Sequence, residues 1–257
     1  MTTEIEITSE KTMPQNDAIR FAYVGDHFDL RAGGNYIVKS KTFYTNYRPI
    51  WNFLGDTTIK LVLERDESTY LLDSTVINPS LERPPALVGD ICMTPEGTFR
   101  LDSKNFEIRA NGLYIPDWWF EPANETADSL NPEHQNGPEA DGDPIWVTLE
   151  ESIKLSHLGD FYNFNAPNKP PKYHTVRSKT FISHKMDGSV WSIETIVEDP
   201  EHQERHLSTH VEARELIVPY AKAGDNILLA DGSRSKVAYK VFSRSSSSQH
   251  YSFGLRY

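Results

Sequence analysis

Three histidines lie at four-residue spacing in the C-terminal half of the chain, at His202, His206 and His210. Imidazole nitrogens are common zinc ligands, and this spacing would align them on one side of a helix. The surrounding sequence alternates like a strand, however, with Leu207 and Val211 on one face. On a strand, His206 and His210 share the opposite face, and His202 lies in the preceding turn. We therefore keep a zinc site at these three histidines as one hypothesis, beside the simpler interpretation that they are solvated surface side chains.

A dense aromatic cluster, Trp118, Trp119 and Phe120, precedes a polar stretch at 121–144 that is rich in Asn, Pro, Glu, Asp and Gly. Such a stretch buries too little apolar surface to fold alone. The aromatic cluster either packs this linker onto a domain or docks a protein partner, in which case the linker becomes ordered against that partner. Exposed Trp118, Trp119 or Trp191 could instead stack on sugar rings.

Other signatures of chemistry are missing from the sequence. It has no Gly-rich phosphate loop followed by Lys-Ser/Thr, and no Gly-x-Ser-x-Gly nucleophile elbow. The single cysteine, Cys92, lies in an apolar run, which favours a buried thiol over a nucleophile. We therefore predict no catalytic or cofactor-binding residues, and zinc is the one cofactor that the histidine hypothesis requires.

The elements that position these residues are written twice in the chain. Val176–Phe181 repeats the Val-Lys-Ser-Lys-Thr-Phe pattern of Val38–Phe43, with Arg177 in place of the first lysine. Gly-Asp pairs recur in phase with this repeat, at 25–26, 89–90, 159–160 and 224–225. We infer a tandem duplication of a unit of about 100 residues. The Gly-Asp pairs are typical of tight turns.

The predicted fold is all-β, with two tandem duplicated β-sandwich or β-barrel domains. Short runs of alternating and aromatic residues between turn signals favour strands, and no stretch has a convincing helical repeat. Residues 19–24 are expected to open the first domain as a strand. Hairpins are expected at 59–76 and 192–211, and Phe43 and Phe181 are expected in equivalent core positions. The predicted boundaries are 1–17 for an N-terminal extension that is frayed or adds an edge strand, 18–115 for the first β domain, 116–150 for the aromatic cluster and acidic linker, and 151–257 for the second β domain.

Charge and hydropathy limit the partners. The formal net charge of −11 disfavours binding to nucleic acid or to an anionic membrane. No apolar run approaches the roughly 20 residues that span a bilayer. The first residues lack the basic start and apolar core of a signal peptide. We expect a protein that is not secreted by a signal peptide and that stays in the cytoplasm, or in a virion if it is viral.

These observations favour a non-enzymatic structural or assembly protein that works by protein–protein contact in a homo- or hetero-oligomer. A virion component of a tailed phage, in the baseplate, neck or fibre attachment, is the specific expectation, by fold-level association. One alternative is a metal-dependent enzyme or metal-binding module that uses the three histidines. Another is a carbohydrate-binding module.

Overall fold

The structure is a computed structural model, and it describes residues 6–30, 34–45, 57–76, 86–95, 97–109, 112–123, 147–166, 168–211, 220–244 and 250–257. These residues form one mixed sheet with two short helices, which confirms the all-β prediction. The strands up to the linker are β1 (Glu6–Pro14), β2 (His27–Asp29), β3 (Asn35–Thr45), β4 (Thr57–Arg65), β5 (Ser68–Val76), β6 (Ile91–Thr94), β7 (Gly97–Ile108) and β8 (Tyr114–Pro122). The later strands are β9 (Phe161–Asn163), β10 (Tyr173–Ser183), β11 (Trp191–Glu198), β12 (Glu204–Val211), β13 (Asn226–Leu228), β14 (Arg234–Lys236), β15 (Tyr239–Arg244) and β16 (His250–Arg256). The helices are α1 (Gln15–Phe21) and α2 (Leu149–Leu155).

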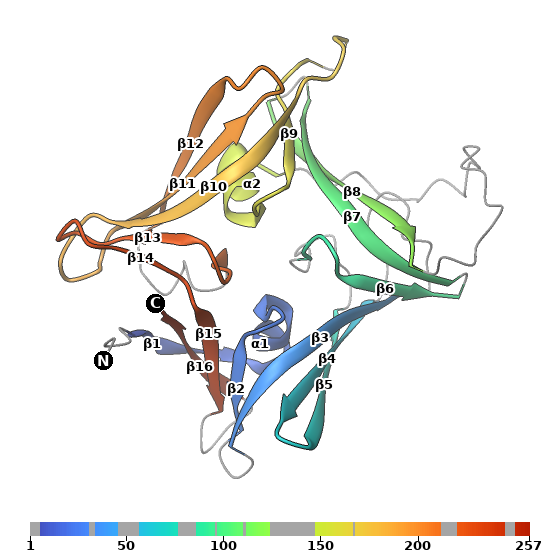
Figure 1. Cartoon of the computed structure of the whole chain (residues 1–257), viewed down its shortest axis with the longest axis vertical. Helices are drawn as coiled ribbons and strands as arrows, with labels where there is room; N and C mark the ends of the chain where they lie inside the picture. The colour runs from blue at the N-terminus through green and yellow to red at the C-terminus, as the bar shows by residue number, and fades with distance from the viewer. Residues whose placement is uncertain are drawn as a thin grey trace.

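The sheet closes into a ring around the two helices (Figure 1). Four parallel strand pairs join successive parts of the chain: β3 with β6, β7 with β9, β10 with β13, and β15 with β2. The fourth pair brings the C-terminal part of the chain back to its start. Since β14 pairs with β13 and leads through two residues into β15, the circuit is complete.

Four groups of antiparallel strands, which we call the corners, make up this ring (Figure 1). They are β3–β4–β5, β7–β8, β10–β11–β12 and β15–β16–β1. The fourth corner takes its third strand from the opposite end of the chain, because β1 pairs with β16. Residues 6–14 are therefore an added strand, one of the two possibilities expected for residues 1–17.

The core is shared between the two predicted domains. The larger buried cluster contains Phe43 and Ile59 from the first range together with Phe181 and Ile193 from the second. A smaller cluster surrounds Tyr162. Residues of both ranges thus lie in one sheet and share the larger buried cluster, and a separate sandwich or barrel in each range is not confirmed.

The hairpins follow the sequence prediction, and the helices do not. β4 pairs with β5 and β11 with β12, as expected from their alternation. The stretch 19–24, however, is not a strand, since α1 runs to Phe21. α2 begins with a capping box, in which Glu151 N–H donates to the Thr148 hydroxyl and Thr148 N–H donates to the Glu151 carboxylate. Each helix has only seven residues, too few for a helical repeat to be recognised in the sequence.

Candidate functional site

Four turns of the described chain have the same geometry: Tyr23–Asp26, Leu87–Asp90, His157–Asp160 and Lys222–Asp225. In each turn, the aspartate N–H donates to the carbonyl three residues earlier, at 2.9–3.1 Å. The N–H of that earlier residue donates back to the aspartate Oδ2, at 2.7–2.9 Å. The expected tight turns at the Gly-Asp pairs are therefore confirmed. The structure shows that the backbone N–H and the side-chain carboxylate of each aspartate both close its turn.

The glycine of each turn is required by its backbone conformation. Its φ lies between 90° and 96° in all four turns, the left-handed region that a type II turn needs at its third position. A Cβ at these positions would meet nothing within 4 Å. The requirement is thus conformational rather than steric.

A buried lysine lies at the same place relative to each turn. The turn glycine donates to the carbonyl of Val38, Leu101, Val176 or Val237, and Lys41, Lys104, Lys179 and Lys240 each follow that residue by three positions. Their relative exposure is 3%, 2%, 0% and 0%. In the first three strands a β-bulge lies between the apolar residue and the lysine, and in the fourth the strand breaks between β14 and β15. The irregularity turns the lysine to the same interior side as the apolar residue.

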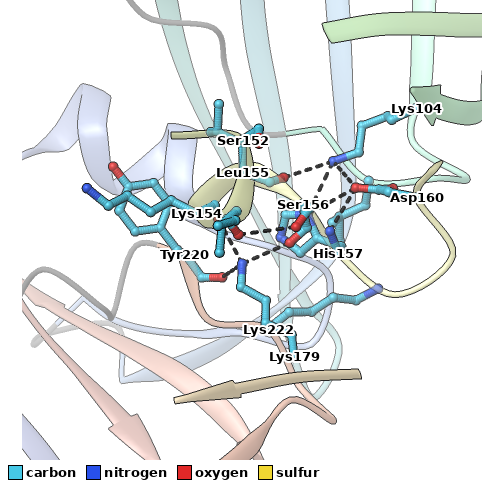
Figure 2. A network of polar contacts seen from close by, with 12 residues as sticks. Lys104, Ser152, Lys154, Leu155, Ser156, His157, Asp160, Lys179, Tyr220 and Lys222 are labelled. Carbon is cyan, nitrogen blue, oxygen red and sulfur yellow. Dashed lines mark hydrogen bonds and ion pairs between the residues drawn. The ribbon is translucent and has the colours of Figure 1, made fainter. Parts of the chain in front are cut away.

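The lysine ammonium groups bind the C-terminal ends of the two helices. Lys41 donates to the carbonyl oxygens of Arg20 and Ala22, and Lys240 donates to that of Phe21. At α2, Lys179 donates to the carbonyls of Lys154 and Ser156, and Lys104 donates to that of Leu155; Figure 2 shows this end. The last carbonyls of a helix have no partner within the helix and carry partial negative charge. The lysine ammonium groups donate hydrogen bonds to these carbonyls and place positive charge beside them.

Two of these lysines also form buried ion pairs with the aspartate of the following turn. Lys104 Nζ lies 2.9 Å from Asp160 Oδ2, and Lys240 Nζ lies 3.4 Å from Asp26 Oδ2. In every parallel strand pair, the residue after the lysine is the partner of the residue after the next aspartate, as in Val241 with His27. The strand register therefore sets each lysine beside the next turn, around the whole ring.

A hydrogen-bonded chain crosses the ring from the first turn to the third. Lys104 Nζ lies 3.2 Å from His157 Nδ1, and His157 Nε2 lies 3.1 Å from the Tyr23 hydroxyl. An ammonium only donates, so His157 Nδ1 accepts and Nε2 carries the proton that is donated to Tyr23. Lys104 thereby uses its three protons on Leu155, His157 and Asp160.

Burial dominates the electrostatics of this interior. It raises the pKa of Asp26, Asp90, Asp160 and Asp225 and is opposed in each case by a neighbouring lysine. It lowers the pKa of Lys41 to about 7, and that of Lys179 and of Lys240 to about 8. His157 has a pKa well below its ordinary value, through burial and then the charge of Lys104, so its ring is neutral. The polar groups of this network bond to the chain itself, which is the pattern of a structural network.

The three histidines of the predicted site lie on β12 and in the turn before it. His206 and His210 are exposed on β12, on the face opposite Thr209 and Val211, as the alternation predicts. His206 Nδ1 lies 2.9 Å from Glu194 Oε1, and His202, in the turn, pairs with the Glu198 carboxylate. Across the part of the chain that the structure describes, no group of three or more His, Cys, Asp or Glu side chains is arranged to hold a metal ion. His210 instead has its ring centroid 6.2 Å from that of His184, a residue that the sequence pattern did not select.

The aromatic cluster lies on β8, paired with β7. Trp119 is 51% exposed, whereas Phe120 packs against the larger core. The side chain of Trp118 and residues 124–146 of the linker lie outside the described part. Trp191 is buried and its indole N–H donates to the Gly188 carbonyl, so it offers no platform for a sugar ring.

Cys92 is buried, as predicted, and burial raises the pKa of its thiol to about 12. A thiol with this pKa is not a nucleophile near neutral pH. The structure thus gives no reactive role to the single cysteine.

Comparisons with protein-family models, with curated proteins and with solved structures found no match to this chain. Within the described residues, neither helix has the length and apolar character needed to cross a membrane. The four lysines are the main feature that sequence reasoning missed. Their signal was a lysine three positions after an apolar residue, downstream of each of the four Gly-Asp pairs.

Proposed function

We propose that this protein is a non-enzymatic structural component that acts through protein–protein contact. Its rigid frame is the ring of strands, held together by the four turn aspartates and the four buried lysines. The observation that carries the proposal is that the buried lysines and aspartates bond to other groups of the chain itself. Lys104, Lys179 and Lys240 each donate to three acceptors of the chain itself, which consumes the protons of an ammonium. The aspartates close the turns. These groups are committed to holding the ring together rather than to a substrate.

The four-fold recurrence of the turn and its lysine supports an origin by duplication. We propose that the duplicated unit contains two turns, as the in-phase sequence match implies, and that each half supplies two corners of one ring. A rigid ring whose corners carry hairpins outward suits a component that contacts several neighbours. A virion component of a tailed phage, in the baseplate, neck or fibre attachment, remains the specific instance that we propose, in a homo- or hetero-oligomer.

The outer face of β8 is the docking surface that we propose for a protein partner. Trp119 is half exposed there, and Phe120 anchors the same strand in the core. A large aromatic side chain on a firmly held strand is a common centre of an interface, because it buries much area with little loss of conformational freedom.

Size-exclusion chromatography with light scattering, in the presence of a chelator, tests the proposal. We expect a discrete species larger than the 29.3 kDa chain, and Trp119→Ala should shift it toward 29.3 kDa. Met186→Ala is the matched control, because Met186 is 80% exposed on a different corner. A wild-type chain that stays at 29.3 kDa would contradict the proposal.

The metal-binding alternative keeps one supporting observation, the proximity of His210 to His184. The carbohydrate-binding alternative keeps only the half-exposed Trp119 among the described tryptophan side chains, because Trp191 is buried.

A further inference from the structure

The outer face of the corner β10–β11–β12 carries two histidines that approach each other from different strands. His184 directly follows β10, and its N–H donates to the Val190 carbonyl, which extends the pairing with β11. His210 lies on β12. Both side chains are exposed, and their ring centroids are 6.2 Å apart with 55° between the ring planes.

The residue between them explains why the two rings can meet. Ser192 on β11 pairs with Ile182 on one side and with His210 on the other. Its short side chain leaves room above the central strand for the two longer side chains. Ser192 is 6% exposed, and its hydroxyl lies 2.8 Å from His184 Nε2.

This separation fits two imidazoles that share one metal ion. A zinc–nitrogen bond of about 2.0–2.1 Å places the ion about 3.2 Å from each ring centroid, so two ligating rings lie at most about 6.4 Å apart. A tetrahedral angle at the ion brings the centroids to about 5 Å, which side-chain rotation of two exposed rings can supply. The arrangement therefore lies within reach of metal-binding geometry.

The contact with Ser192 is the outer-shell partner that such a site uses. A metal-ligating histidine commonly donates its second ring N–H to an oxygen, which fixes the tautomer and the orientation of the ring. If His184 Nε2–H donates to the Ser192 hydroxyl, Nδ1 keeps its lone pair for the metal.

His206 provides a contrast on the same strand and the same face. Its Nδ1 lies 2.9 Å from the Glu194 carboxylate, and its Nε2 lies 4.0 Å from Glu204. It is thus engaged with carboxylates, whereas the neighbour of His210 is a second imidazole.

We propose that His184 and His210 bind one divalent transition-metal ion, with Zn²⁺ or Cu²⁺ as the chemically suited class and with Ser192 orienting His184. Two coordination positions of a tetrahedral ion then remain for water or for a ligand from a partner. This site is independent of the assembly function, so either can fail without the other.

Isothermal titration of the whole chain with Zn²⁺ alone tests the site. We expect one ion per chain, and His184→Ala or His210→Ala should each weaken binding at least about tenfold, since even outer-shell changes at metal sites cost 10–100-fold. Ser192→Ala should weaken it about tenfold. Circular dichroism melting checks that the exposed-site variants stay folded.

His206→Ala is the matched control and should leave the affinity unchanged. The proposal is overturned if the wild-type chain takes up no zinc, or if His184→Ala and His210→Ala bind it as tightly as wild type. It is equally overturned if His206→Ala weakens binding as much as His210→Ala, because the sequence-predicted set would then be the site.

Discussion

Lys240 and Asp26 are joined by two bonds although 214 positions separate them in the chain. Lys240 N–H donates to Asp26 Oδ1 at 2.8 Å, and its ammonium lies 3.4 Å from Asp26 Oδ2. The same lysine donates to the Phe21 carbonyl at the end of α1. One residue near the C-terminus thus holds the first turn, the first helix and the closing strand pair together.

Removal of the Lys240 charge should lower the free energy of unfolding. In Lys240→Met, Asp26 keeps a buried carboxylate without its cation, and breaking a buried pair in this way typically costs about 3–5 kcal/mol of unfolding free energy. Urea denaturation measures the loss. The control is Lys39→Met, because Lys39 is half exposed and lies 3.8 Å from Glu64, and such pairs are worth at most about 1 kcal/mol. Equal losses in the two variants would show that the ring does not depend on Lys240.

Stability should rise with pH between about 7 and 10. Folded Lys41 loses its proton at about 7, whereas the unfolded chain holds it to 10.5, so in this window the unfolded state binds more protons and a rise in pH favours the folded state. Lys179 and Lys240 add to the slope above about 8. Urea denaturation at a series of pH values measures it. Lys41→Met should flatten the slope near pH 7–8, and an unchanged slope in that variant would assign the effect elsewhere.

Phe43 and Phe181 should contribute equally to the free energy of unfolding. Both rings are buried, at 1% and 0% exposure, in the larger core. Replacement of either by alanine should lower the unfolding free energy by about 3–5 kcal/mol, the usual cost of an aromatic truncated in a core. Met186→Ala, at a side chain that is 80% exposed, is the control. A loss under about 1 kcal/mol for either phenylalanine would show that its ring contributes little packing.

A disulfide between the first and last strands should stabilise the ring. Thr12 and Ser252 are Cα partners on β1 and β16, and the one native cysteine, Cys92, is buried. A Thr12→Cys, Ser252→Cys chain should form an internal disulfide that raises the unfolding free energy by up to about 4–5 kcal/mol, since the closed loop is long. Non-reducing electrophoresis and denaturation with and without reductant measure this. Disulfides formed only between chains would mean that β1 pairs with another copy.

The sequence by itself determined the elements whose signals are local. Alternation within 59–76 and 192–211 specified two hairpins, because a strand with one buried face must keep a period of two. The Gly-Asp pairs specified the turns, since glycine is the residue that adopts a positive φ without strain. The in-phase repeat of Phe43 and Phe181 indicated two equivalent core positions, and both rings are buried.

Only the tertiary structure decided where the charges go. Strict alternation would place Lys41 and Val38 on opposite faces, but the bulge between them turns both inward, and a bulge depends on contacts with the neighbouring strand. The partners of each lysine lie on other elements, up to 219 positions away in the case of Lys240 and Phe21. His184 and His210 likewise come together across β11, where the short side chain of Ser192 lies between their strands. Long-range pairing of this kind leaves no periodic trace in the sequence, so the ring and the partners of its buried lysines could be found only in three dimensions.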